Sequence, residues 1–225
     1  MVTKNTSDEQ LDLLLINPGG REEIYQELGA ELSAVEPPLW CRLIAGYVRD
    51  RDLSVAILDA EALKIGPAEI AKEVRAANPR LIGMIVFGHQ PSASTQQMAG
   101  AGAACRAIKD DAPDYSIIMV GGHVSALPER TLVEEPIDYA CKGEGPITVV
   151  QLLEALKTGE TEDLSTVEGL VWTRDDKIVV NPSAALITSL DKDLHGNAWD
   201  LLPMEKYRAH NWQSFGDLGS REPYA

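Results

Sequence analysis

The alternation of short apolar runs with segments of helical periodicity constrains the fold of this chain more than any other feature. Five runs are rich in aliphatic and β-branched residues: LDLLLI (11–16), LSVAIL (53–58), LIGMIV (81–86), YSIIMV (115–120) and IDYAC (137–141). Several of them show no alternation of polar and apolar residues. This is typical of strands that are buried on both faces of a parallel sheet.

Amphipathic helices are predicted between these runs. Residues 38–50 place their apolar side chains on one stripe behind two prolines, which suit a helix start. The same periodicity recurs in residues 67–77, 95–109 and 146–157, and a short turn at 128–134 completes the series of crossovers. Strands that alternate with helices predict an α/β, doubly wound, Rossmann-like sheet of five parallel strands in the flavodoxin-like order 2-1-3-4-5.

The character of the sequence changes after Gly159. Two β-prone runs, Leu170 to Thr173 and Lys177 to Val180, flank three polar residues and predict a β-hairpin at an edge of the sheet. The segment from Pro182 to Ala225 shows no periodic element, but it is too aromatic for a flexible linker and should pack on something. We therefore expect an α/β domain (1–160), an appended β-hairpin (161–182) and an irregular C-terminal connector (183–225).

The composition argues against several classes of partner. Twenty Lys and Arg residues against 35 Asp and Glu give a net charge of -15, which repels nucleic acid and anionic membranes. The N-terminus is polar, and no run reaches the length of a membrane span. Cys41, Cys105 and Cys141 lie far apart and should be buried thiols. A cytoplasmic protein without nucleic acid or membrane partners is expected.

Glycine-bearing loops follow four of the five predicted strands. They are Asn17-Pro18-Gly19-Gly20, Gly88-His89-Gln90-Pro91-Ser92, Gly121-Gly122-His123 and Gly143-Glu144-Gly145. The carboxyl ends of parallel strands share the edge of the sheet where ligands bind, and glycine lets backbone amides approach a ligand closely. Each loop alone is explained by ordinary turn formation. Four together predict a site for a large ligand, to which the long loop from Asn17 to Pro37 could contribute.

Common nucleotide and catalytic motifs are absent from the expected places. The stretch NPGGREE after the first strand matches neither G-x-G-x-x-G nor G-x-x-x-x-G-K-[ST]. No Ser-His-Asp or Cys-His arrangement can be placed, and three scattered cysteines do not suit an iron–sulfur cluster. We therefore expect that this chain does not catalyse a reaction alone.

The order of these motifs resembles the N-terminal cobalamin (B12)-binding domain of B12-dependent radical SAM enzymes. The resemblance lies in LLLINPGG, EPPLWCRLIAGYVRDRDLSVAILDAEA, GHQPSAST, MVGGHVSALPERTLVEEPIDYACKGEG and VEGLVWTRDDKIVVNP, and it covers nearly the whole chain. The combination of GGHVSALPE with KGEG is its most specific part. The final segment, DLLPMEKYRAHNWQSFGDLGSREPYA, resembles the connector that leads into the radical SAM barrel.

This resemblance implies a cobalamin-binding module of a longer enzyme, a methyltransferase or an enzyme of related radical chemistry. In that parent enzyme a radical SAM domain of the same polypeptide would hold a [4Fe-4S] cluster and S-adenosylmethionine, and its C-x-x-x-C-x-x-C motif is not in this chain. The loop after the first strand also lacks D-x-H-x-x-G, which implies base-off cobalamin without that axial histidine. A non-catalytic corrinoid carrier or B12 sensor, and a flavin- or nucleotide-binding doubly wound domain, stay open as alternatives.

The predicted cofactor-binding residues come from the four loops and from the start of the helix at 95–109. They are Asn17, Pro18, Gly19, Gly88, His89, Gln90, Ser92, Ser94, Gly121, Gly122, His123, Gly143, Glu144 and Gly145. The small residues Gly121, Gly122, Ser92 and Ser94 should leave room for the nucleotide tail of cobalamin. Ser94 with Gln97 would form a capping box at a helix N-terminus that could meet the phosphate.

The histidines and one glutamate have two interpretations each. His89 is a candidate axial ligand of the cobalt ion, or a loop residue with a local hydrogen bond. His123 should pack or form a hydrogen bond near the nucleotide tail. Glu144 could bind a ribose hydroxyl or a corrin amide, or cap the helix that follows it. His195 and His210, in the connector, should be structural.

Overall fold

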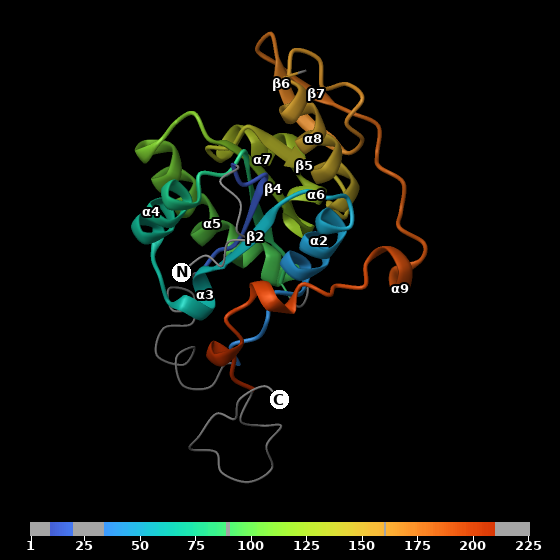
Figure 1. The fold of residues 1–225 in the computed structure, drawn as a ribbon. Helices are drawn as coiled ribbons and strands as arrows, with labels where there is room; N and C mark the ends of the chain where they lie inside the picture. The colour runs from blue at the N-terminus through green and yellow to red at the C-terminus, as the bar shows by residue number, and fades with distance from the viewer. Residues whose placement is uncertain (1–9, 20–33, 89–90, 160, 210–225) are drawn as a thin grey trace.

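A computed structural model of the protein describes residues 10–19, 34–88, 91–159 and 161–209 (Figure 1). Its strands are β1 (Leu13–Asn17), β2 (Val55–Asp59), β3 (Leu81–Val86), β4 (Ser116–Gly121), β5 (Tyr139–Cys141), β6 (Leu170–Arg174) and β7 (Lys177–Val180). They form one sheet in the order β2-β1-β3-β4-β5-β6-β7. The first five strands are parallel, and their predicted order is confirmed.

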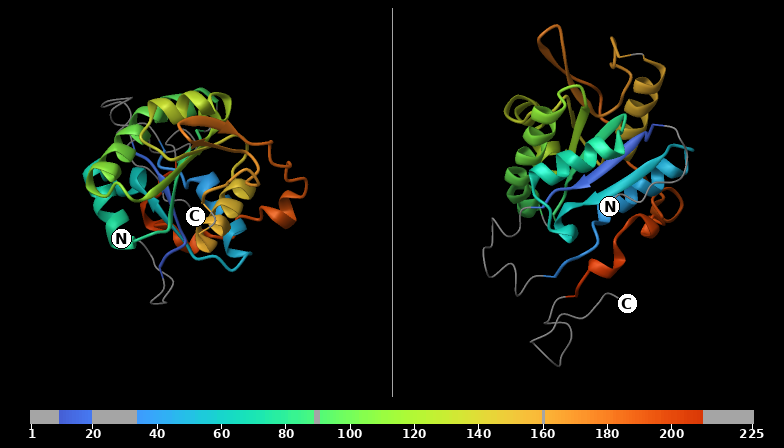
Figure 2. Two further views of the ribbon diagram at one scale, coloured as in Figure 1. Left: turned by 90° about the horizontal axis from the view of Figure 1, so that it is seen from above. Right: turned by 60° about the vertical axis from the view of Figure 1, so that its left-hand side comes forward.

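Helices cover both faces of this sheet (Figure 2). They are α2 (Leu39–Arg49), α3 (Ala60–Leu63), α4 (Pro67–Ala77), α5 (Pro91–Asp111), α6 (Gly122–Ala126), α7 (Pro128–Glu134), α8 (Pro146–Thr158), α9 (Leu190–Asp193) and the 3-10 turns η1 (Trp199–Leu201) and η2 (Met204–Lys206). Helices α2 and α8 pack with the connector on one face, and α4 and α5 pack on the other. The result is a three-layer α/β/α arrangement.

Both faces of the central strands are buried, which explains the unbroken apolar runs in the sequence. Leu13 and Leu15 of β1 point toward α2 and α8, whereas Leu14 and Ile16 point toward α4 and α5, and all four are 0% exposed. Successive side chains of a strand alternate between its faces, so a strand covered on both sides needs apolar residues at every position.

The predicted helices are confirmed, and α5 differs most from its predicted range. It begins at Pro91 rather than at residue 95. Proline suits the first position of a helix, because the amide hydrogen it lacks has no partner there. The small polar residues that follow Pro91 add nothing to the apolar stripe, and the prediction from periodicity therefore placed the start four residues too late.

The predicted hairpin is confirmed and extends the same sheet. Strand β6 pairs antiparallel with β5 and with β7, which raises the strand count from the predicted five to seven. The turn uses Asp175 and Asp176 at positive φ angles of 50° and 59°. Two successive residues at positive φ give a turn whose twist matches that of the paired strands.

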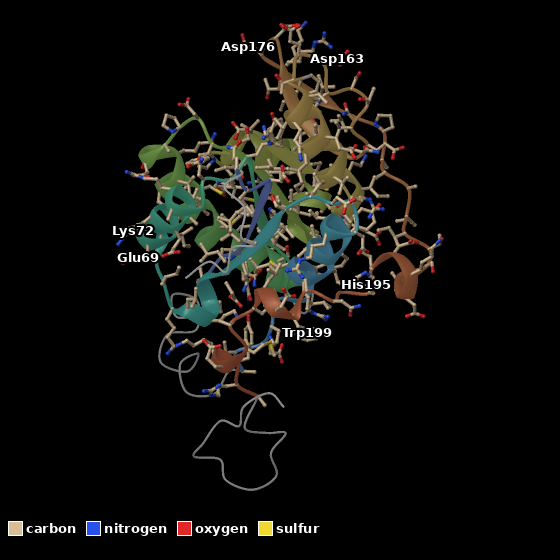
Figure 3. All side chains as sticks on the ribbon, in the orientation of Figure 1. Glu69, Lys72, Asp163, Asp176, His195 and Trp199 are labelled. Atoms are coloured by element: carbon tan, nitrogen blue, oxygen red, sulfur yellow. The ribbon has the colours of Figure 1, made fainter. Side chains whose placement is uncertain are left out.

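The middle of the connector, residues 195–200, packs along α2 (Figures 1 and 3). Arg49 donates two hydrogen bonds to Asp200, at 2.8 and 2.6 Å. Nε2 of His195 lies 2.7 Å from Oδ2 of Asp50, so the predicted structural role of this histidine is confirmed. The ring of Trp199 lies 3.8 Å below the guanidinium of Arg42. His210 and the aromatic residues beyond it lie outside the described residues.

The expected burial of the three cysteines is confirmed. Cys41, Cys105 and Cys141 are free thiols with 0% exposure. Burial raises the pKa of Cys105 to about 12 and that of Cys141 to about 11, so both are neutral. Among the helices of the described segments, none has the length and apolar character needed to cross a bilayer.

Candidate functional site

The parallel sheet brings the described parts of the four predicted loops to its carboxyl edge. A hollow of about 250 Å³ opens there between the ends of β1 and β3, the point at which the strand order reverses. Asn17 and Pro18 line it from β1, Phe87 and Gly88 from β3, and residues 36–41 close it from the start of α2. Such a switch point is the common ligand site of open α/β sheets.

One wall of this hollow is aromatic. The rings of Trp40 and Phe87 stack with their centroids 4.3 Å apart and their planes inclined by 17°. Leu39, beside them, is 51% exposed, which is high for a leucine next to a hollow. A flat apolar surface with an exposed leucine at its edge suits a broad, planar ligand.

The polar groups of the hollow include an acceptor for which the described residues provide no partner. The side-chain oxygen Oε1 of Gln97 is buried and accepts no hydrogen bond within the described structure. A buried acceptor left unsatisfied costs about 1–3 kcal/mol, and a ligand that carries a suitable donor would recover this energy. The hollow therefore favours a ligand with N–H or O–H donors at its edge.

A buried carboxylate lies directly behind the hollow. Asp59, at the end of β2, is 1% exposed. Its Oδ1 accepts hydrogen bonds from Nδ2 of Asn17 at 2.8 Å and from the amide of Ala62 at 3.1 Å, and its Oδ2 accepts one from the hydroxyl of Tyr207 at 2.8 Å. All three donors are neutral, and burial raises the pKa of Asp59. Burial and the Asp59 carboxylate together raise the pKa of Cys41, which also lines the hollow.

The capping role predicted for Ser94 is wrong. Ser94 lies inside α5, because this helix begins at Pro91. Its hydroxyl donates to the carbonyl of Val86 and accepts the amide of His123 at 3.0 Å. Ser94 therefore ties α5 to the ends of β3 and β4.

The glycines of the second and third loops also serve the packing of the chain itself. A Cβ atom on Gly121 would lie 2.2 Å from the carbonyl oxygen of Val86, and one on Gly88 would lie 2.2 Å from Cβ of Ala93. Gly121 therefore permits the close approach of β3 and β4, and its role in leaving room for a nucleotide tail stays a prediction. Gly122 is different, because the nearest atoms to its Cβ position are 3.7 Å away. A role of these residues in cofactor binding stays a prediction.

His123 and Glu144 have partners within the protein. Nδ1 of His123 lies 3.0 Å from the hydroxyl of Thr95, a local hydrogen bond of the predicted kind. The carboxylate of Glu144 accepts the amide of Ile187 at 3.5 Å, and no side chain caps α8, so the capping interpretation is wrong.

The fourth loop faces a different hollow from the first and second. Gly143, Glu144 and Gly145 line a second space of about 250 Å³, which residues 183–187 of the connector close. Gly143 and Gly145 adopt φ angles of +135° and +105°, which only glycine adopts readily. The fourth loop therefore does not line the hollow at the ends of β1 and β3.

Several predicted residues are not described by the structure. His89, Gln90 and the side chain of Ser92 lie outside the described residues, and axial ligation by His89 stays a prediction. Within the described segments, no group of three or more histidine, cysteine or acidic side chains could hold a metal ion.

Other residues of the site were missed by sequence reasoning. These are Trp40, Asp59 and Phe87, together with Tyr207 of the connector, whereas Gln97 was predicted only as a partner of Ser94 in a capping box. Asp59 had a usable signal, since a lone acid that ends an apolar strand lies at the ligand edge of the sheet. Tyr207 had none, because its contact with Asp59 spans 148 residues of sequence.

Comparison with known proteins identifies relatives of this chain. The family model of the B12 binding domain matches residues 26–153. A protein described as an uncharacterized methyltransferase of Pyrococcus horikoshii is 30% identical over 200 residues, which cover 88% of this chain and 40% of that protein. The anaerobic magnesium-protoporphyrin IX monomethyl ester cyclase of Synechocystis sp. is 29% identical over 200 residues, which cover 87% of this chain and 37% of the cyclase. The chain thus spans less than half the length of these relatives.

Solved structures share its fold. The radical S-adenosylmethionine methyltransferase TsrM from Kitasatospora setae, solved with cobalamin and a [4Fe-4S] cluster, superposes with a TM-score of 0.58 at 20% identity, over 84% of this chain and 31% of TsrM. The cobalamin-dependent S-adenosylmethionine radical enzyme OxsB, solved with aqua-cobalamin, gives a TM-score of 0.59 at 19% identity, over 83% of this chain and 24% of OxsB.

Proposed function

This chain belongs to the B12-binding domain family, and from that premise we propose that it is the cobalamin-binding module of a B12-dependent radical SAM enzyme. The two solved neighbours named above are radical S-adenosylmethionine enzymes whose structures contain a cobalamin. One sequence relative is described as a methyltransferase and the other as a cyclase. The observation that carries the proposal is the family match together with a hollow at the switch point of the sheet.

The residues of this hollow fit an edge of a corrin ring. A corrin is a broad, largely apolar disc rimmed by amides. The hollow offers the stacked Trp40 and Phe87 beside the acceptor of Gln97, which has no partner among the described residues. Its volume of about 250 Å³ is below the roughly 300–1,000 Å³ of pockets that enclose a drug-sized ligand. The hollow would therefore take one edge of the disc and its side chains.

Bound cobalamin supplies an organometallic cobalt centre for the transfer of a methyl group or for a related radical reaction. The work of this chain is to bind and orient the disc. Trp40 and Phe87 would exclude water from one side of it, and Gln97 would accept a hydrogen bond from a peripheral amide. The loop residues Gly88 and Pro18 would pack against its rim.

The rest of the proposed enzyme lies beyond this module. We propose that a radical SAM domain of the same polypeptide follows the connector and holds the [4Fe-4S] cluster and S-adenosylmethionine. The proposal has three further parts. The chain is divided into domain, hairpin and connector at residues 160 and 182, the cobalamin is bound base-off, and the protein is cytoplasmic. A sequence continuing past Ala225 with C-x-x-x-C-x-x-C would support an enzyme, whereas a stop codon there would favour a corrinoid carrier or B12 sensor.

Reconstitution with hydroxocobalamin tests the proposal. The purified chain should retain corrin absorption after desalting, and Trp40→Ala should weaken binding by roughly tenfold because it removes the aromatic wall. Trp199→Ala is the matched control, since this tryptophan lies on the connector against Arg42. Retention of flavin instead of corrin, or no corrin absorption at all, would overturn the proposal.

A further inference from the structure

Three side chains connect the connector with the hollow in a continuous series of hydrogen bonds. The ends of β1 and β2 are in register, so Asn17 lies directly opposite Asp59. Nδ2 of Asn17 donates to Oδ1 of Asp59 at 2.8 Å, and the hydroxyl of Tyr207 donates to Oδ2 at 2.8 Å. Asp59 and Tyr207 are 1% and 0% exposed, respectively, whereas Asn17 lines the hollow.

This series fixes the orientation of one amide. A carboxylate can only accept hydrogen bonds, so the NH2 group of Asn17 must face Asp59. The amide is planar and trigonal, and its carbonyl oxygen Oδ1 consequently lies on the side away from Asp59. An asparagine without such a partner could turn either its donor or its acceptor toward a ligand.

The position of Tyr207 is itself well determined. Arg208, the next residue, forms a two-way backbone bridge with Val35, with both N–O distances at 2.9 Å. Val35 directly precedes Glu36 and Pro37, which line the hollow. The connector therefore contributes both a backbone bridge beside the hollow and the hydroxyl group that holds Asp59.

We propose that Asp59 and Tyr207 are positioning residues that hold Asn17 with its acceptor toward the ligand, which makes the hollow selective for a corrin edge bearing an amide rather than a carboxylate. This inference rests on the proposed function, because it names the chemical group of the corrin that the hollow would recognise. The amide N–H of an acetamide or propionamide side chain would donate to Oδ1 of Asn17. A carboxylate at the same place has no donor and would meet two acceptors, Oδ1 of Asn17 and Oε1 of Gln97.

Binding of hydroxocobalamin and of its monocarboxylic acid derivatives, in each of which one peripheral amide is hydrolysed, tests the inference. By absorption titration, the wild-type chain should prefer hydroxocobalamin over at least one derivative by roughly tenfold. Tyr207→Phe removes one of the donors that hold the Asp59 carboxylate in place and should reduce this preference to about twofold or less. Tyr115→Phe is the matched control, since its hydroxyl donates to Asn78 at 3.3 Å on the far side of the sheet, and it should keep the preference.

Asn17→Leu provides a second, independent test. It removes one of the two acceptors and should reduce the preference to about twofold or less, and adding Tyr207→Phe to it should change the preference no further, because both act through one amide. A Tyr207→Phe chain that loses affinity equally for all the corrinoids would overturn the inference, as would a wild-type chain without any preference. Failure of the wild-type chain to bind hydroxocobalamin would instead overturn the proposed function itself.

Discussion

Two buried aspartates at opposite ends of neighbouring strands have opposite electrostatic environments. Asp12, just before β1, is 6% exposed, and Asp59, at the end of β2, is 1% exposed. Burial favours the neutral form of Asp12, but hydrogen bonds from Ser54 and the ammonium of Lys157, 3.1 Å away, outweigh it and lower its pKa. Burial raises the pKa of Asp59, and its neutral donors oppose this only in part.

The difference distinguishes the amino edge of the sheet from the carboxyl edge, at which we propose that the ligand binds. At the amino edge, Asp12 also accepts the amide of Ser54 at 2.9 Å and lies 3.8 Å from Arg80, so its charge is compensated. At the carboxyl edge, a buried carboxylate lies beside a hollow with neutral donors around it. Proteins retain such costly groups mainly where they serve binding or chemistry.

The largest effect is expected at the carboxyl edge, where glycine permits close packing of β3 and β4. Gly121→Ala would place Cβ 2.2 Å from the carbonyl oxygen of Val86 and 2.7 Å from its carbon. Because backbone atoms must move apart, the free energy of unfolding should fall by about 2–3 kcal/mol. Urea denaturation would measure this change.

Gly122→Ala is the control for this prediction, since its Cβ would lie 3.7 Å from the nearest atoms, those of Ser94. We expect its free energy of unfolding to differ from that of the wild type by less than about 0.5 kcal/mol. Equal destabilisation by the two substitutions would show that the carboxyl edge is not closely packed at Gly121.

An intermediate effect is expected at the amino edge. Asp12→Asn removes the charge that pairs with Lys157 and one of the acceptors that bind Ser54, and it should cost about 1–2 kcal/mol at neutral pH. The pKa of Asp12 is lower in the folded state than in the unfolded state, so its stabilisation is present above the unfolded pKa and disappears as the pH falls through the folded pKa. Urea titrations in an acidic pH series should show the two proteins converging, and a constant difference would contradict this account.

The sequence predicted the sheet better than the site, and the reason is physical. Strand order and helix positions follow from local patterns, because burial on both faces requires an apolar residue at each position of β1 and β3. The sequence also predicted that glycines lie at the carboxyl edge of the sheet. Gly121, however, serves packing against the neighbouring strand, which the local sequence does not show. Asp59 and Tyr207 form a contact between distant segments, and no local pattern encodes such a contact.

The smallest effect should occur at Asp59, with the opposite sign to that at Asp12. Asp59→Asn keeps an acceptor for Asn17 and Ala62, and its new amide can donate to the oxygen of Tyr207. The pKa of Asp59 is higher in the folded state than in the unfolded state, so ionisation destabilises the wild-type chain as the pH rises through this window, from about pH 4 upward. At neutral pH the variant should therefore be as stable as the wild type or more stable, by less than about 1 kcal/mol.

Paired urea titrations of the two variants across the same pH series decide whether the two edges differ as described. Below the unfolded pKa, Asp59→Asn should lose its advantage, because Asp59 is then neutral in the folded and unfolded chains. Asp12→Asn should lose its deficit at lower pH, as the pH falls through the folded pKa of Asp12. If Asp59→Asn were instead less stable at neutral pH, and this deficit shrank with acid, the carboxylate of Asp59 would be stabilised by its surroundings as that of Asp12 is. Ionised Asp59 would then not destabilise the folded chain. A role of Asp59 in orienting Asn17 would have to rest on hydrogen-bond geometry alone.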